Sequence, residues 1–180
     1  ELNISCPNVD RGGIEFGADP VMTEKTVSEV KKVFARPVIA KLGPMVTSIV
    51  AIAQAAEQGG ADALAIMNSA FGTAIDTETW RPRLTNNRGG LTGPAIKPIA
   101  LAMVDAVYQK CRLPIIGIGG VTTAEDAVEF FLVGATAVQV GTALFVQPDA
   151  PVRIVDGLKQ YMKRKKLATI AEMVGKVRKW

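Results

Sequence analysis

The sequence predicts an α/β fold of parallel βα units, forming part of a (β/α)8 (TIM) barrel. Short β-rich apolar runs alternate with longer helical patterns through all 180 residues. These runs do not alternate with polar residues, which is typical of parallel strands buried on both faces. Two phrases also repeat in the same order: RPVIAKLG (36–43) returns as LPIIGIGG (113–120), and EQGGADALAIMNS (57–69) returns as LVGATAVQVGT (132–142).

Five strands are predicted where a closed barrel has eight. The strands are Glu1–Ser5, Val38–Leu42, Ala63–Met67, Ile115–Ile118 and Ala137–Val140. The helices are Thr23–Phe34, Thr47–Gln58, Ala95–Lys110, Ala124–Val133 and Val152–Arg164. Because the chain opens on a strand without an initial Met, we expect it to hold about the last five βα units of a barrel. A doubly wound sheet is the alternative, but SCPNVDRGG after the first strand is not its glycine fingerprint.

No linker or second domain is indicated, so residues 1–180 are expected to be the C-terminal part of one barrel domain. One long insertion, at about 71–93, separates the third strand from its helix. GTAIDTETWRPRLTNNRGGLTG is typical of a hairpin or excursion over the top of the barrel. Trp80 within it is interpreted as a packing residue.

Composition limits the classes of function. The chain is 48% hydrophobic and 21% charged, and its apolar runs are too short to cross a bilayer. With no signal-peptide layout, we expect a cytoplasmic protein that does not enter a membrane. There is no His, and the two Cys have no zinc spacing, so no metal site is predicted. The net charge of +4 owes much to KRKK (163–166), which indicates a solvated helix and not a nucleic-acid site.

Polar residues and glycines gather where the predicted strands end, which is the face that carries the chemistry in barrels. Gly119 and Gly120 end the fourth strand, and Gly141 and Thr142 end the fifth. Backbone N–H groups of such glycines can approach an anion, although each glycine alone could simply make a turn. Their occurrence at adjacent strand ends favours a phosphate site.

The other strand ends predict a polar mouth. Lys41 lies inside an apolar strand, where an ammonium needs an anionic or electron-rich partner. A ligand is the favoured partner, and a salt bridge to a carboxylate from another strand is the alternative. Asn68 and Ser69 end the third strand.

Cys6 follows the first strand, next to Pro7 and between Asn3 and Asn8, whose amides can recognise carbonyl and carboxylate groups. Cys6 could be a plain buried thiol, but these neighbours favour a base that acts through its thiolate. Cys111, near the N-terminal end of a strand, is interpreted as structural.

Several of these phrases together resemble the catalytic subunit of dihydroorotate dehydrogenase, type 1B. They are ELNISCPNV, FGADP, AKLGPMVTSIVAIAQAAEQGGADALAIMNS, GGLTGPAIKPIAL and PIIGIGGVTTAEDAVEFFLVGATAVQVGTALF. The resemblance spans nearly the whole chain, and GGLTGPAIKPIAL favours the NAD-linked branch over the fumarate-using 1A branch. It implies an FMN-binding barrel that oxidises dihydroorotate to orotate in pyrimidine biosynthesis. It also implies electron transfer to NAD through a partner subunit with FAD and an iron–sulfur cluster, in a heterotetramer containing a homodimer of catalytic subunits.

The resemblance also implies roles for particular residues. Cys6 matches the base that removes a proton from C5 of dihydroorotate while C6 is oxidised by FMN. Substrate contacts match Asn3, Asn8, Asn68 and Ser69. FMN contacts match Asn3, Lys41, Met67, Gly93, Gly119, Gly120, Gly141 and Thr142, where Lys41 lies beside the ring and stabilises the reduced flavin.

Some positions depart from the family pattern. Met67 replaces a usual isoleucine, Ser69 a common threonine, and GPMV a frequent SPNV. The family's first three βα units, with a further lysine and an amide-rich loop, have no counterpart here, so the 180-residue chain alone is expected to be inactive. A flavin barrel resembling dihydropyrimidine dehydrogenase and a non-catalytic phosphate-binding fragment remain the alternative interpretations.

Overall fold

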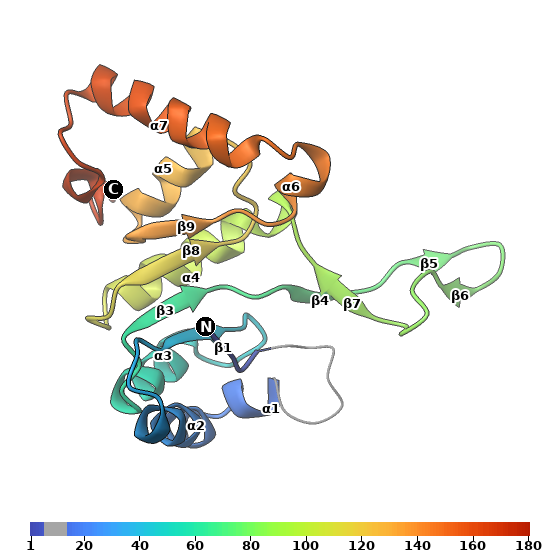
Figure 1. Ribbon diagram of the computed structural model, residues 1–180. Coiled ribbons are helices and arrows are strands. Elements are labelled where there is room, and N and C mark those ends of the chain that lie inside the picture. Colours follow the sequence, from blue (N-terminus) through green and yellow to red (C-terminus); the bar gives the residue numbers. More distant parts are fainter. Residues whose placement is uncertain (6–13) are drawn as a thin grey trace.

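Five parallel strands form the main sheet of the computed structural model, which describes residues 1–5 and 14–180. The strands are β1 (Leu2–Asn3), β2 (Ile39–Leu42), β3 (Ala63–Ile66), β8 (Ile115–Ile118) and β9 (Ala137–Gln139). They lie in the order β1-β2-β3-β8-β9 (Figure 1), so spatial order follows chain order. A doubly wound sheet reverses its order at a switch point, whereas a barrel wall does not. The strand order therefore favours the barrel.

The five predicted helices are all present. They are α2 (Pro20–Val33), α3 (Ile49–Gln58), α4 (Lys97–Tyr108), α5 (Ala124–Leu132) and α7 (Ala150–Lys165). The patterns do not predict four short segments: α1 (Ile14–Gly17), α6 (Ala143–Val146) and the 3-10 turns η1 (Pro94–Ile96) and η2 (Ile170–Met173). None exceeds four residues, which is too short for a periodic pattern to emerge. No helix in the described ranges is both long and apolar enough to span a membrane.

Two helices begin at residues other than those that apolar periodicity predicts. α2 begins at Pro20, three residues before the predicted start at Thr23, because Asp19 caps it and accepts a hydrogen bond from Met22 N at 2.9 Å. α3 begins after Ser48, whose hydroxyl accepts from Ala51 N at 3.3 Å. Capping chemistry, and not hydrophobic spacing, therefore sets these boundaries.

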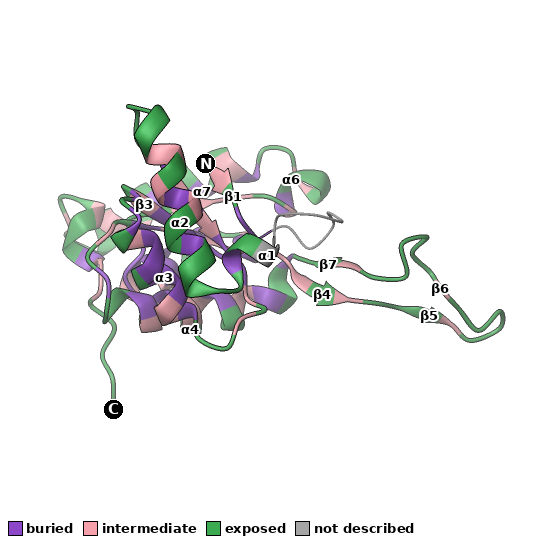
Figure 2. Cartoon of the chain, turned by 90° about the horizontal axis from the view of Figure 1, so that it is seen from below, coloured by how far each residue is buried: buried purple, intermediate pink, exposed green. Residues whose placement is uncertain are grey.

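The two faces of the sheet differ in burial. Ala40 and Leu42 belong to the core under the helices and are fully buried. Lys41, Ile116 and Gln139 lie on the opposite face and stay partly exposed. Figure 2 shows the buried residues concentrated where helices and sheet meet. The helices thus cover one face of the sheet, and the other face carries Lys41 and Gln139 beside apolar residues.

A hydrogen bond between the two outer strands shows that the sheet is curved. In a flat sheet with strands 4.8 Å apart, β1 and β9 would lie about 19 Å from each other. Yet Gln139 Nε2 in β9 donates to Oε2 of Glu1, the residue before β1, at 3.0 Å. Side chains of this length meet only if the sheet bends toward its uncovered face, as the wall of a barrel does.

The segment between β3 and α4 is a long hairpin that projects from the sheet (Figure 1). β4 (Ala70–Gly72) pairs with β7 (Gly89–Leu91), and further out β5 (Ile75–Asp76) pairs with β6 (Arg81–Pro82). At the tip, Asp76 Oδ1 accepts from Glu78 N at 3.0 Å and from Thr79 N at 2.9 Å. Trp80 beside this turn is 86% exposed, so its interpretation as a packing residue is wrong within this chain.

Close packing between β8 and α5 gives a prediction about stability. A Cβ at Gly117 would collide with the ring of Phe130, which is completely buried. We expect Gly117→Ala to lower the free energy of unfolding by about 1–3 kcal/mol through overpacking, measured by chemical denaturation. Gly141→Ala is the control, because a Cβ there meets nothing within 4 Å. Equal stabilities for the two variants would contradict this account of the packing.

Candidate functional site

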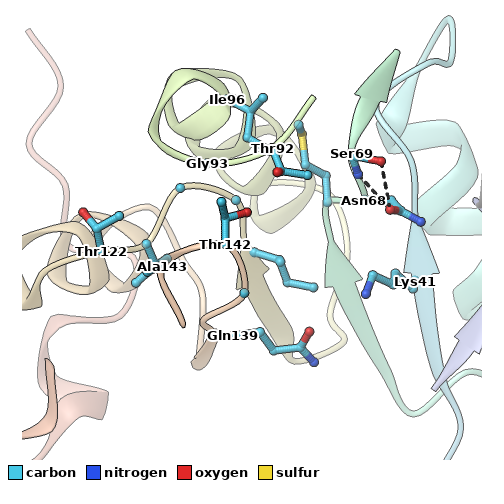
Figure 3. A pocket seen from close by; sticks show the side chains of 16 residues that line it. Lys41, Asn68, Ser69, Thr92, Gly93, Ile96, Thr122, Gln139, Thr142 and Ala143 are labelled. Carbon is cyan, nitrogen blue, oxygen red and sulfur yellow. Dashed lines mark hydrogen bonds between the residues drawn. The ribbon is translucent and has the colours of Figure 1, made fainter. Parts of the chain in front are cut away.

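A cleft of about 200 Å³ lies at the C-terminal ends of β3, β8 and β9 (Figure 3). Strand ends, the residues that follow β7 and the start of α6 all contribute to it. Its lining includes Lys41, Met67, Asn68, Ser69, Thr92, Gly93, Ile118, Gly119, Gly120, Gln139, Gly141 and Thr142. This volume is smaller than a typical pocket for a whole cofactor, so the cleft encloses only part of such a ligand.

One wall of the cleft is the loop that joins β8 to α5. Gly119 and Gly120 have φ values of 126° and 73°, a region that other residues adopt rarely. A Cβ at Gly120 would lie 2.9 Å from Gly93 O and 2.8 Å from Lys97 Cβ. Glycine therefore lets this loop approach the end of the hairpin and the start of α4 closely.

Asp126 holds the same loop from behind. Its Oδ2 accepts from Thr122 N and Thr123 N, both at 2.8 Å, and from Thr122 Oγ1 at 2.7 Å. Its Oδ1 accepts from Lys97 Nζ at 2.6 Å, and Lys97 also pairs with Glu129 at 2.9 Å. Burial alone would raise the pKa of Asp126, but the hydrogen bonds from Lys97 and Thr122 outweigh it and hold that pKa well below its ordinary value. An ionised carboxylate thus fixes the loop to α4 and α5.

Gly141 and Thr142 form the opposite wall, after β9. A Cβ at Gly141 would meet nothing within 4 Å, so neither packing nor a positive φ requires glycine there. Gly141 lines the cleft, and Figure 3 shows Thr142 near the middle of the cleft. Exposed backbone and a hydroxyl facing two further glycines are groups that suit a phosphate.

Amides and hydroxyls cluster at the other end of the cleft. Asn68 Nδ2 donates to Asn3 Oδ1 at 3.2 Å and to Ser5 Oγ at 3.1 Å, which joins the ends of β1 and β3. Ser5 Oγ in turn donates to Lys41 O at 2.8 Å. Asn68 Oδ1 accepts from Ser69 N at 2.8 Å (Figure 3). This network orients a row of groups that can both donate and accept hydrogen bonds.

Lys41 forms a salt bridge with a carboxylate from another strand, which the sequence analysis gave as the alternative to a ligand. Its Nζ lies 3.1 Å from Glu1 Oε1 in a salt bridge. Contact of Lys41 with a ligand stays a prediction, and only the low rank given to the salt bridge is wrong. That rank rested on the ends of the strands, which carry amides, whereas Glu1 is the residue before β1 and reaches Lys41 on the adjacent strand β2.

The structure brings most of the predicted site residues together in this cleft. Nine of them line it: Lys41, Met67, Asn68, Ser69, Gly93, Gly119, Gly120, Gly141 and Thr142. Asn3 joins them through its hydrogen bond with Asn68. Cys6 and Asn8 lie outside the described residues.

The sequence interpretation missed two polar residues, Glu1 and Gln139. Their signal was available, because each is a polar residue in or beside an otherwise apolar strand, where burial is costly without a partner. Cys111 lies away from the cleft and is buried. Burial raises the pKa of its thiol to about 11, which agrees with a structural role.

A family model and curated relatives both match this chain over most of its length. The family model described as dihydroorotate dehydrogenase matches residues 1–162. The dihydroorotate dehydrogenase B (NAD(+)) catalytic subunit of Alkaliphilus oremlandii is 51% identical over 98% of this chain and 59% of its own length. The protein of the same name from Geotalea uraniireducens is 51% identical over 97% of this chain and 57% of its own. The chain thus spans less than three fifths of these relatives.

A solved structure shows the fold. The crystal structure of Eimeria tenella DHODH in complex with ferulenol superposes with a TM-score of 0.80 at 22% identity, over 96% of this chain and 52% of that one. With the parallel strand order, this likeness confirms the prediction of a partial (β/α) barrel. Given the family match over residues 1–162 and relatives at about half identity, the chain belongs to the dihydroorotate dehydrogenase family.

Proposed function

We propose that this protein oxidises dihydroorotate to orotate in pyrimidine biosynthesis with FMN as its cofactor. The observation that carries the proposal is a single cleft with two unlike ends. Gly119, Gly120 and Gly141 lie at one end, where the space at Gly141 is open, and the hydrogen-bonded amides of Asn3 and Asn68 lie at the other. A phosphate-bearing cofactor beside a small polar ring compound would use both ends.

The groups present fit FMN. Its phosphate would be held by Gly119, Gly120, Gly141 and Thr142, where the open space at Gly141 leaves room for it. Lys41, Met67 and Gly93, from the same lining, would contact the ring. FMN, when bound, supplies the two-electron acceptor that no amino-acid side chain provides.

Substrate recognition would fall to the amide end of the cleft. Dihydroorotate carries ureide N–H and C=O groups and a carboxylate, which suit the paired donors and acceptors of Asn3, Asn68 and Ser69. Asn8 is proposed to join them. Cys6 is proposed as the base that takes the proton from C5 of the substrate, since the chain has no His to do so.

The proposal extends to the electron acceptor. The relatives' name, dihydroorotate dehydrogenase B (NAD(+)) catalytic subunit, supports NAD as the final acceptor and a second subunit that delivers the electrons. We propose that this subunit carries FAD and an iron–sulfur cluster and assembles with a homodimer of catalytic subunits into a heterotetramer.

The test of this function is flavin binding to the natural gene product. We expect a yellow protein that releases FMN on denaturation, and a colourless protein with no affinity for added FMN would contradict the proposal. Gly141→Ala should fold normally but lower FMN affinity roughly tenfold or more, because its methyl group fills the phosphate space. Gly72→Ala, on the hairpin and outside the cleft, is the matched control and should bind FMN as the natural protein does.

A further inference from the structure

A carboxylate beside the cleft is bound by two of the residues that line it. Glu1 Oε1 lies 3.1 Å from Lys41 Nζ, and Glu1 Oε2 accepts from Gln139 Nε2 at 3.0 Å. Lys41 and Gln139 both line the cleft, and the side chains of Glu1 and Lys41 are 28% and 21% exposed. Glu1 therefore bonds directly to two residues that line the ligand space.

The two bonds hold Glu1 more firmly than one ion pair would. Its partners come from β2 and β9, which are separated in the sheet by β3 and β8. Each carboxylate oxygen has its own donor, so the carboxylate cannot rotate without losing one bond. Among the described residues, Glu1 supplies the only acceptor within hydrogen-bond distance of Lys41 Nζ. The position of the ammonium group is thus set by Glu1.

Glu1 and Lys41 together also set the net charge next to the cleft. Burial would raise the pKa of Glu1, but the hydrogen bonds from Gln139 and Lys41 bring it below its ordinary value. Glu1 is therefore ionised at neutral pH, and its negative charge offsets the positive charge of Lys41. A ligand in the cleft meets a neutral pair and not an isolated cation.

We propose that Glu1 is a positioning residue that fixes Lys41 and offsets its charge, so that the cleft favours reduced over oxidised FMN less strongly than a lone lysine would. This inference rests on the proposed function and deepens it. A lone cation beside the ring would stabilise the negatively charged reduced form and make it a weaker electron donor. Electrons that must continue to NAD leave more readily from FMN when its reduced form is stabilised less strongly.

The experiment compares the affinities of Glu1→Gln for the two oxidation states of FMN. Glutamine keeps the size and a hydrogen-bonding oxygen but removes the charge. We expect the ratio of reduced to oxidised affinity to rise about tenfold, since one unit charge near the ring is removed. Spectroelectrochemical titration of bound and free FMN gives this ratio without any measurement of turnover. Glu29→Gln is the matched control: Glu29 pairs with Lys32 on α2, outside the cleft, and its ratio should not change.

A second variant keeps the test decisive if Glu1→Gln fails to fold. Glu1→Asp keeps the charge but is one methylene shorter, so it cannot hold Lys41 and Gln139 together. Its affinity ratio should shift in the same direction by a smaller factor. An unchanged ratio in the variants that fold and bind flavin would overturn the inference and leave the proposed function intact. A natural protein without affinity for FMN would overturn both.

Discussion

Cys6→Ser is expected to lower the rate of dihydroorotate oxidation by about 10²–10⁴-fold at neutral pH, with FMN still bound. A serine hydroxyl is a far weaker acid than a thiol, so at neutral pH almost none of it is available as a base. Stopped-flow measurement of flavin bleaching by dihydroorotate isolates this step from later electron transfer. The residual activity of the variant should keep rising with pH beyond the range in which the natural protein levels off.

The chain contains its own control for this experiment. Cys111→Ser makes the same atomic change in a buried thiol that lies away from the cleft. Its bleaching rate per bound flavin should match that of the natural protein, even if its stability is lower. A Cys6→Ser variant that bleaches at the natural rate would remove Cys6 from the reaction.

Asp126→Ala is expected to lower the free energy of unfolding by about 3–5 kcal/mol. The substitution leaves the Lys97 ammonium without its nearest carboxylate and leaves the N–H groups of Thr122 and Thr123 without their acceptor. Removing one member of a largely buried ion pair has this cost because the other charge stays behind, although Glu129 compensates in part. Chemical denaturation measures the loss. FMN affinity should fall as well, since the loop that carries Gly119 and Gly120 loses its anchor.

A control variant and the pH dependence of stability distinguish the anchoring role of Asp126 from a general effect of removing a charge. Asp156→Ala removes an exposed carboxylate paired with Lys159 and should cost less than about 1 kcal/mol. Because the pKa of Asp126 is lower in the folded than in the unfolded chain, its contribution is complete above about pH 4 and fades as pH falls further. The stability difference between the natural protein and Asp126→Asn should therefore shrink in acid. A constant difference down to pH 2 would contradict this role.

The order of elements was predictable because each βα unit carries its own local signals. The Gly-Ala joints at Gly60 and Gly134, both with positive φ, end helices and admit the next strand. The repeated phrases then give the order of the units. What the apolar pattern alone missed was the start of α2, where two other local signals, Asp19 as cap and Pro20 as first residue, set the boundary.

The glycines and amides of the cleft were predictable because parallel strands end on the same edge of a sheet, whatever its curvature. The partner of Lys41 was not predictable in this way. Glu1 reaches Lys41 from the adjacent strand, but it reaches Gln139 only because the sheet bends, and the bend is a property of five strands together. Residues at the beginning of a strand therefore escape a search confined to strand ends.

The bond between Glu1 and Gln139 also bears on the order in which the molecule folds. It joins residues 138 positions apart, and the chain between them contributes most of the residues that line the cleft. Such distant contacts form late, since the intervening chain must first be ordered and the loop closed. The cleft is therefore completed only when β9 docks, so a molecule able to hold a ligand there is one in which β1 and β9 have already met.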